Sequence, residues 1–355
     1  MRLFDRNYKY YMIVPAILLI LFIYLVFFSP KIAQGIDLKG GTLIVFKADK
    51  PVDAKKLEGI LSEQFNFSEL KVSSVSGPGG YGVNIEFAEN KDLSNAAKEL
   101  NLAKGFLESN DAANAELHAR NSITSSLIFL KDESMPSLKG KDLVDKADEL
   151  YSKARNSFTE EIRQVIRQNF GLSSESFFQV RSIEPTLGKA FRDNAVFVAI
   201  VAFISIIIVV FVAFREFIPS LAIIFAGMFD VLSAMSGMVF FGIPLSLNSI
   251  PALLMLFGYS VDTDILLTTR LLKRRERTPR ERTIDAMWTG ITMTLTALVA
   301  VIVMLVFSYL YQIIVIFEIA AVLLFGLIGD MIATWMFNAP VLLWYFESIK
   351  SRVRK

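Results

Sequence analysis

The sequence contains no cysteine and only one histidine, His118. Without cysteine there are no disulfides, thiolate metal ligands or cysteine nucleophiles. A single histidine cannot build a histidine-based metal site alone, and we expect His118, in a polar stretch, to be a solvated surface residue. No GxxxxGK[ST] phosphate-binding motif is present either. We therefore predict no metal and no cofactor, and any work that this protein does must draw on a source other than bound ATP.

Charged residues are scarce over much of the chain. Hydrophobic residues make up 53% of the 355 residues, and the mean hydropathy is +0.47. Residues 31–193 hold 22 of the 37 Lys and Arg and 24 of the 35 Asp and Glu. One balanced, soluble-looking block thus lies within a very apolar frame. This excludes a simple globular enzyme and a disordered chain, and the lack of a basic stripe excludes a nucleic-acid binder.

The apolar frame contains six segments long enough to cross a bilayer, which takes about 20 mostly apolar residues. The first is preceded by basic residues and is not followed by a cleavage site, so we expect a retained anchor. The last is too long for one straight crossing, and we expect Asn338 and Pro340 to mark its inner end. The predicted spans are Met12–Phe28, Ala195–Phe214, Phe217–Phe241, Ser249–Thr269, Ala286–Phe307 and Gln312–Phe346.

The basic residues of this frame predict its orientation. All 15 fall in the N-terminal tail, at Arg215, in Arg270–Arg282 or in Lys350–Lys355. With the N-terminus inside, every one of them is cytoplasmic, as the positive-inside rule requires. We therefore expect a multi-pass protein of the cytoplasmic membrane with both termini in the cytoplasm. The expected domains are a tail and first helix (1–29), an extracytoplasmic domain (30–193), a five-helix bundle (194–346) and a basic cytoplasmic tail (347–355).

The block between the first and second spans has the pattern of an α+β domain. Its predicted elements follow the order βαββ…αβ, which is typical of a ferredoxin-like sandwich. Residues 90–140 form a helical insertion or flexible lobe in this scheme. The expected strands are Thr42–Lys47, Leu70–Val75, Tyr81–Phe87 and Phe177–Ile183, and the expected helices are Val52–Phe65 and Lys141–Asn169.

Acidic residues inside the spans are the candidate functional residues, because a mid-membrane carboxylate costs about 2.5–3.5 kcal/mol to insert. Asp230 lies on the third span, and Asp262 and Asp264 lie on the fourth. Helical spacing places Asp264 on one stripe and Asp262 on another. We predict a proton relay of Asp262, Asp264 and Asp230; the alternative is a set of permanently protonated acids that hold helices together by hydrogen bonds. The expected supporting polar residues are Ser260, Thr263, Thr268 and Asp330.

Several motifs resemble those of one family. Gly35-Ile-Asp-Leu-Lys-Gly-Gly-Thr42, after the first span, resembles the GxDxxGG motif of protein-export membrane subunits. Phe229-Asp230-Val231 and Gly258-Tyr259-Ser260 are similar to motifs of the SecF family, and Val261–Arg270 resembles its archaeal type. One span, a large external domain and five further spans also form the half-unit of the resistance–nodulation–division superfamily. The resemblance makes Asp37, Gly40 and Gly41 a motif that couples the domain to the bundle.

The resemblance implies an auxiliary subunit and not an enzyme. Its implied partners are SecD, the SecY/SecE channel, an unfolded exported polypeptide and membrane lipid, with coupling to the proton gradient. The chain departs from bacterial members in having Thr263 at their acid position and no arginine at the start of the fifth span. The alternatives are a small-molecule or lipid exporter of the same superfamily and an intramembrane aspartyl protease. For the protease, Leu327-Ile-Gly-Asp330 lacks the first glycine of GxGD.

Overall fold

A computed structural model describes most of the chain, which folds into two compact units. One unit is formed by the two ends of the chain, and the other by Ile36–Arg192. The described residues are 8–28, 32, 34–48, 50–65, 67, 69–77, 80–88, 90–130, 132–170, 178–183, 185–273, 277–311 and 313–350.

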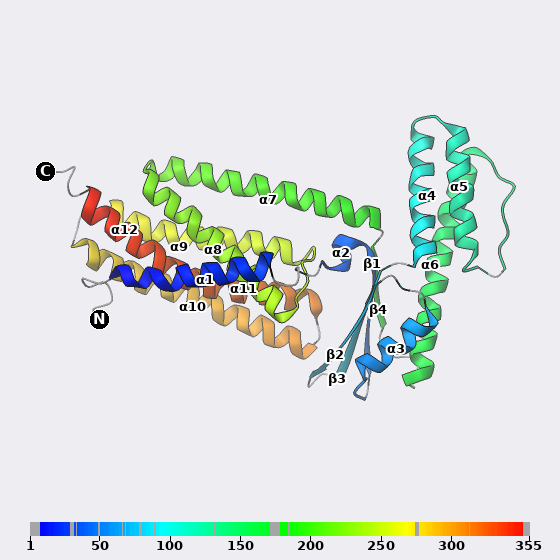
Figure 1. The fold of residues 1–355 in the computed structure, drawn as a ribbon, viewed down its shortest axis with the longest axis horizontal. Helices are drawn as coiled ribbons and strands as arrows, with labels where there is room; N and C mark the ends of the chain where they lie inside the picture. The colour runs from blue at the N-terminus through cyan, green and yellow to red at the C-terminus, as the bar shows by residue number, and fades with distance from the viewer. Residues whose placement is uncertain are drawn as a thin grey trace. The chain divides into compact units, whose positions relative to one another are not determined.

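The Ile36–Arg192 unit contains a four-stranded sheet (Figure 1). The strand order is β2-β3-β1-β4, and every described pair is antiparallel. This order and the βαββ…αβ sequence of elements confirm the ferredoxin-like prediction. The strands are β1 (Gly41–Ala48), β2 (Leu70–Gly77), β3 (Gly80–Phe87) and β4 (Phe178–Ile183); a short helix, α2 (Ile36–Lys39), precedes them.

Helices α3 (Ala54–Gln64) and α6 (Gly140–Phe170) supply apolar side chains to the core that the sheet also faces. Alternate residues of a strand point to one face, so Ile44 and Phe46 of β1 lie in this core with Ile85 of β3. The ring of Phe158 on α6 meets the ring of Phe87 edge-on, with 6.3 Å between the ring centroids. The residues of α3 and α6 that lie in this core recur at helical spacing, whereas β1 is buried on both faces, since Leu43 and Val45 are buried as well.

The segment predicted as an insertion is helical. It forms α4 (Lys91–Glu108) and α5 (Ala112–Leu127), which pack against each other and against α6 (Figure 1). His118 on α5 is wrongly predicted as solvated, because it is half-buried and stacks on Phe106 with 5.2 Å between ring centroids. Its Nδ1 lies 2.8 Å from Oε2 of Glu99, and this hydrogen bond lowers the pKa of Glu99. His118 thus ties α5 to α4.

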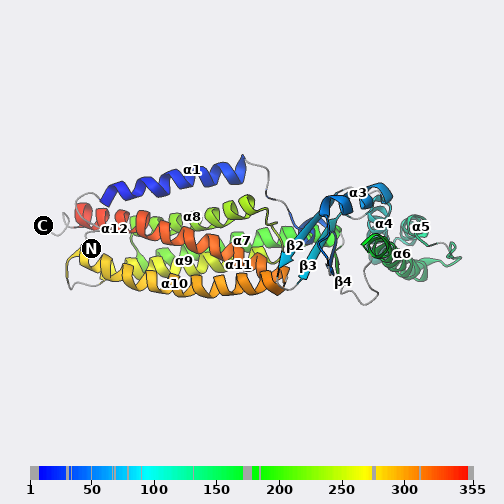
Figure 2. The same cartoon turned by 90° about the horizontal axis from the view of Figure 1, so that it is seen from below.

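The other unit contains the helices that are long and apolar enough to span a membrane, and all six predicted spans are confirmed as helices (Figure 2). Among them α8, α9 and α11 contact one another, while α1 and α10 pack at their periphery. The last turns of α7 pack on α8 and α9 through Val210 and Phe214. The bounds are α1 (Ile13–Phe27), after the short 3-10 turn η1 (Tyr8–Met12), α7 (Pro185–Phe214), α8 (Phe217–Phe241), α9 (Ser249–Lys273), α10 (Pro279–Tyr311) and α11 (Ile314–Ile332).

The sequence suggested that the sixth span ends at Asn338 and Pro340. The helix of this span continues past both residues. It continues through a π-helical turn, η2 (Ala333–Asn338), into α12 (Ala339–Tyr345) and a further π-helical turn, η3 (Phe346–Lys350). A π turn widens the helix locally, so the bulky ring of Pro340 and its missing N–H are accommodated without ending the span. Asn338 is buried in the bundle, and the helix continues past it.

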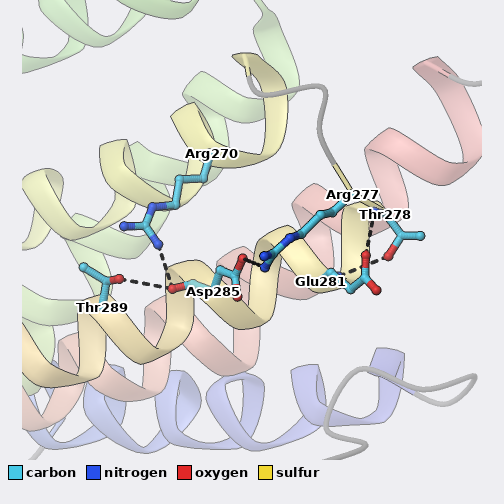
Figure 3. Close-up of polar contacts among 6 residues, drawn as sticks. All are labelled: Arg270, Arg277, Thr278, Glu281, Asp285 and Thr289. Carbon is cyan, nitrogen blue, oxygen red and sulfur yellow. Dashed lines mark hydrogen bonds and ion pairs between the residues drawn. The ribbon is translucent and has the colours of Figure 1, made fainter.

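The basic segment between α9 and α10 is held by local polar contacts (Figure 3). Arg270 donates to the backbone carbonyl of Asp285 at 2.7 Å, and Arg277 pairs with the Asp285 carboxylate at 2.8 Å. Thr278 and Glu281 form a capping box in which each side chain accepts from the other's backbone N–H, at 2.9 and 3.3 Å. Several charges of this segment therefore fix the start of α10.

Candidate functional site

Three helices bring three acids into the interior of the bundle. Asp230 on α8, Asp264 on α9 and Asp330 on α11 are each fully buried. The close approach of α8 and α11 depends on Gly329, because a Cβ there would lie 2.5 Å from Cβ of Ser233. The small residue thus allows Asp330 to lie beside the helix that carries Asp230. The sequence predicted Asp230 and Asp264 as central residues and Asp330 as a supporting one.

Hydroxyl and amide groups from the same helices contact these carboxyl groups. Ser260, one turn before Asp264 on α9, donates to Oδ2 of Asp230. Asn338 donates from Nδ2 to Oδ1 of Asp264 at 2.6 Å. The Oγ1 atom of Thr294, on α10, lies 3.4 Å from Oδ2 of Asp330. The acids and their partners form one buried polar cluster, which we call the acid cluster.

The hydroxyl of Thr334 joins two of the acids. Its Oγ1 lies 3.0 Å from Oδ1 of Asp264 and 3.1 Å from Oδ1 of Asp330. A hydroxyl has one hydrogen to donate and can accept through its lone pairs. Both contacts are hydrogen bonds only when one of the two carboxyl groups is protonated and donates to Thr334. The geometry therefore suits a cluster that holds a proton and can pass it between Asp264 and Asp330.

No basic side chain of the described chain forms an ion pair with the acid cluster. The segment of α10 after Arg282 contains neither Lys nor Arg, and buried Arg282 donates to the backbone carbonyl of Leu271 at 2.8 Å. Oδ1 of Asp230 and Oδ2 of Asp264 are buried without a hydrogen-bond partner among the described residues. Because an unpaired buried charge is costly, this arrangement favours neutral carboxyl groups over a set of carboxylates.

Asp262 lies outside the acid cluster. Its side chain is exposed on the surface of α9, whereas the Asp264 side chain is buried. This matches the two stripes expected from helical spacing, but it separates two members of the predicted relay. Thr268 is buried with Oγ1 unpartnered among the described residues, and Thr263, also buried, faces Gly290 on α10.

The glycine motif lies at the start of the inserted domain. Gly40 has φ 82°, and Gly41 has φ 144°, a region that residues with a Cβ rarely adopt. A Cβ on Gly41 would also lie 2.6 Å from the carbonyl oxygen of Phe87. Asp37 is buried, and its Oδ1 atom has no partner among the described residues. The motif therefore shapes the entrance to β1, and its role in coupling the domain to the bundle stays a prediction.

Three members of the acid cluster were not predicted as site residues, namely Thr294, Thr334 and Asn338. One signal could have found two of them, because Asp330, Thr334 and Asn338 recur every four residues and share a helix face. Thr294 had no such signal, since it joins the cluster only through the packing of α10 on α11.

Together, the fold and the acid cluster define a multi-pass membrane protein with a ferredoxin-like domain between its first and second membrane helices. Residues 163–348 match the family described as protein export membrane protein SecD/SecF, C-terminal, and residues 26–52 match the SecD/SecF GG motif. The chain is 30% identical to the protein-export membrane protein SecF of Methanothermobacter thermautotrophicus over 96% of this chain and 94% of that relative. It therefore belongs to the SecF group of the SecD/SecF family of protein-export membrane subunits.

Other relatives match shorter stretches. The SecF protein of Methanolacinia petrolearia is 49% identical over 46% of this chain and 57% of its own length. Among solved structures, SecDF of Thermus thermophilus, a translocon-associated membrane protein, has a TM-score of 0.59 at 14% identity. That alignment covers 97% of this chain and 59% of the SecDF chain. At this identity the likeness shows the shared fold, and this chain spans somewhat more than half of the SecDF length.

Proposed function

We propose that this chain is the SecF subunit of an export machine, acting with SecD at the SecY/SecE channel to promote passage of unfolded polypeptides across the cytoplasmic membrane. Family membership and full-length similarity to a SecF protein support this role. The energy source in this proposal is the proton gradient. Protons enter the acid cluster, and their binding and release change how α8, α9 and α11 pack.

One observation carries the proton-coupling part of the proposal, namely the Thr334 hydroxyl shared by two buried acids. A hydrogen-bonded chain of carboxyl and hydroxyl groups can move a proton by short hops without separating charge over a long distance. Within the described half-bundle the path runs between Asp264 and Asp330, with Asp230 held through Ser260 on α9. Asp262 lies two residues before Asp264, on the face of α9 that points away from the bundle. In this proposal SecD packs on that face and completes the relay.

The proposed orientation follows the basic residues. Both termini and the α9–α10 connection lie in the cytoplasm, and the ferredoxin-like domain lies outside. In this orientation the inserted domain is on the side where an exported polypeptide emerges. Its coupling to the bundle is assigned to the motif of Asp37, Gly40 and Gly41.

The test is replacement of each acid of the cluster by asparagine, which removes the proton-binding group but keeps its size and hydrogen-bonding capacity. In Asp264→Asn and Asp330→Asn we expect proton-driven export to fall about 100-fold or more, as for loss of a proton-transfer group. Co-purification with SecD must stay normal. Asp262→Asn is measured alongside, because it reports on the side of α9 away from the cluster.

Two results would contradict the proposal. Wild-type export and proton flux in Asp230→Asn, Asp264→Asn and Asp330→Asn, singly and combined, would leave the acids as a structural hydrogen-bond network. Loss of SecD binding in all three variants would likewise assign them to assembly and not to proton transfer.

A further inference from the structure

Glu318, near the start of α11, is a buried acid that does not belong to the acid cluster. Only 7% of its surface is exposed, and its Oε2 atom accepts two hydrogen bonds from the loop between α8 and α9. Ser246 donates from Oγ at 2.7 Å, and Asn248 donates from Nδ2 at 3.0 Å. Burial of an acid is costly unless hydrogen bonds compensate for it. These two contacts therefore fix the loop to α11.

Ser246 also satisfies backbone groups at the start of α9. Its Oγ atom lies 3.2 Å from the backbone nitrogen of Asn248 and 3.2 Å from that of Ser249, which is the arrangement of a helix N-cap. A hydroxyl that accepts from these groups has its one hydrogen left to donate to Glu318. The side chain at position 318 must therefore be an acceptor, and a carboxylate there is also favoured by the positive end of the α9 dipole.

The same loop holds the segment that leads into the inserted domain. The backbone N–H of Gly35 donates to the carbonyl oxygen of Leu245 at 2.7 Å, and Gln34 pairs with Leu245 in a parallel bridge. Gly35 also packs closely on Ser246, since a Cβ on Gly35 would lie 3.2 Å from Cβ of Ser246. The next residue, Ile36, is the first of the domain unit. The residues that precede the domain are thus fixed to a loop that is itself fixed to α11.

We propose that Glu318 is a positioning residue for export, which passes a movement of α11 to residues 34–35 and so to the entrance of the inserted domain. The inference rests on the proposed function, in which proton binding changes the packing of α11. Asp330 of the acid cluster lies twelve residues after Glu318 on this helix, about 18 Å along its axis. Helix shifts of about 1–2 Å are typical of switching proteins. The buried hydrogen bonds of Glu318 carry such a shift of α11 into the loop.

Capping of α9 alone does not require an acid on another helix. Oγ of Ser249 accepts from the backbone N–H of Ser246 at 2.8 Å and donates to its carbonyl oxygen at 3.1 Å. These contacts begin and end at the start of α9, as capping contacts usually do. Glu318 adds a connection between α11 and this loop, and a connection of this kind is what transmission between helices needs.

The test compares export and proton flux for variants of the SecD complex in sealed vesicles. Glu318→Leu removes the acceptor and should lower the amount of polypeptide exported per proton about tenfold, within the usual range of coupling between sites. Proton flux itself should stay within about twofold of wild type, because the acid cluster lies far along the helix. Glu318→Gln keeps an acceptor oxygen for Ser246 and Asn248, so it should export within about threefold of wild type.

Ser249→Ala is the matched control. It removes a buried hydroxyl from the same part of the chain, but one that bonds only the backbone of Ser246. We expect a lower Tm of the complex, because a cap is lost, and an unchanged ratio of exported polypeptide to protons. A purely structural role of Glu318 would give the same pattern in Glu318→Leu.

Hydrogen exchange reads the hold on residues 34–35 without any export. In Glu318→Leu the Gly35 amide should exchange at least about tenfold faster, as expected for loss of a hydrogen bond to a charged group. Glu318→Gln should exchange as wild type does. Asn248→Ala removes one of the two donors and leaves Ser246 in place, so it should give a smaller increase, and it replaces Glu318→Leu if that variant does not assemble.

Three results would overturn the inference. The first is unchanged exchange at Gly35 in Glu318→Leu and Asn248→Ala. The second is a normal ratio of export to proton flux in these variants, or an equal loss of both. The third is a Glu318→Gln variant as defective as Glu318→Leu, since the charge and not the hydrogen bonds would then matter. Failure of the proposed function is seen separately, as export by the wild type that does not depend on the proton gradient, and it leaves the exchange result unaffected.

Discussion

At the scale of single residues, the Thr334 hydroxyl is the contact through which the acid cluster acts as a unit. Thr334→Val keeps the shape of the side chain but removes the group shared by Asp264 and Asp330. We expect proton-driven export to fall at least about tenfold and the complex to lose about 1–3 kcal/mol of stability, because buried polar groups lose a partner. Proton flux and thermal unfolding of the SecD complex measure the two effects.

Thr292→Val is the matched control for this prediction. Thr292 is exposed on α10, and its hydroxyl bonds only the carbonyl of Trp288 in its own helix at 2.8 Å. Its replacement should leave export and stability near wild type. If Thr334→Val behaves like Thr292→Val, the shared hydroxyl has no role in proton transfer.

A second residue-scale prediction concerns Glu86 on β3. Burial raises the pKa of its carboxyl group; Lys71 on the neighbouring strand opposes this, and Asp37 adds to it. Since the folded pKa lies above that of the unfolded chain, the stability contributed by this group is full below the unfolded pKa. It is lost as pH rises through the folded pKa.

Glu86→Gln should therefore raise the Tm of the inserted domain by about 2 °C near neutral pH. Near pH 4, where the wild-type carboxyl is already largely protonated, the variant and the wild type should unfold together. Thermal unfolding followed at both pH values by circular dichroism makes the comparison. A Tm difference that is the same at both pH values would show that ionisation of Glu86 does not affect folding.

The sequence predicted the part of the acid cluster that lies on α9. The spacing of Ser260 and Asp264 placed both on one face of α9, and both are buried, while Asp262 on the other stripe is exposed. Which helix faces these residues is a long-range property that periodicity does not contain. Thr294 was missed for that reason, whereas Thr334 and Asn338 carried a signal in their spacing from Asp330.

At the scale of elements, the backbone conformation at the start of β1 requires glycine at position 41. Gly41→Ala places a Cβ 2.6 Å from the Phe87 carbonyl at φ 144°, so it should destabilise the domain by about 1–3 kcal/mol. Gly59 on α3 is the contrasting glycine, since nothing lies within 4 Å of its Cβ position. Gly59→Ala should stabilise the domain by about 0.5–1 kcal/mol.

Denaturant unfolding of the full-length protein, followed in the inserted domain, measures both variants. Export should fall in Gly41→Ala and stay normal in Gly59→Ala. Equal stability of the two alanine variants would mean that the strained backbone at Gly41 relaxes freely, and the motif would then be a linker only.

Element boundaries were predictable where composition changes sharply. The bounds of α8 match the predicted Phe217–Phe241 at both ends, because charged and turn-forming residues flank it. The prediction failed at Asn338 and Pro340, where a polar residue and a proline usually signal a helix end. The π turn through which the last helix continues past Pro340 is buried against other helices, which stabilises it. This burial depends on long-range packing, so the local sequence does not predict it.

At the scale of the whole molecule, the distribution of basic residues predicts which side each segment faces. The absence of cysteine makes this directly measurable, because a single introduced cysteine is the only site that maleimides label. Ser109→Cys, in the turn after α4, should react with a membrane-impermeant maleimide in intact cells. Ser351→Cys, in the basic tail, should react only after the membrane is opened. The reverse pattern would invert the six-span topology.

The last prediction follows from the exposure of Asp262 and concerns assembly with SecD. An acid on the outer surface of a membrane helix is costly against lipid, so the exposed side of α9 at Asp262 should be covered when SecD is present. Asp262→Cys should therefore react with a maleimide more slowly, by about tenfold, in the SecD complex than in the chain expressed alone, while Ser351→Cys reacts equally in both states. Asp262→Asn completes the argument, since loss of export with an intact complex would mean that the acid works at the subunit boundary. Equal reactivity of Asp262→Cys with and without SecD would instead leave Asp262 facing lipid or water, and the relay would then lie entirely within the acid cluster of this chain.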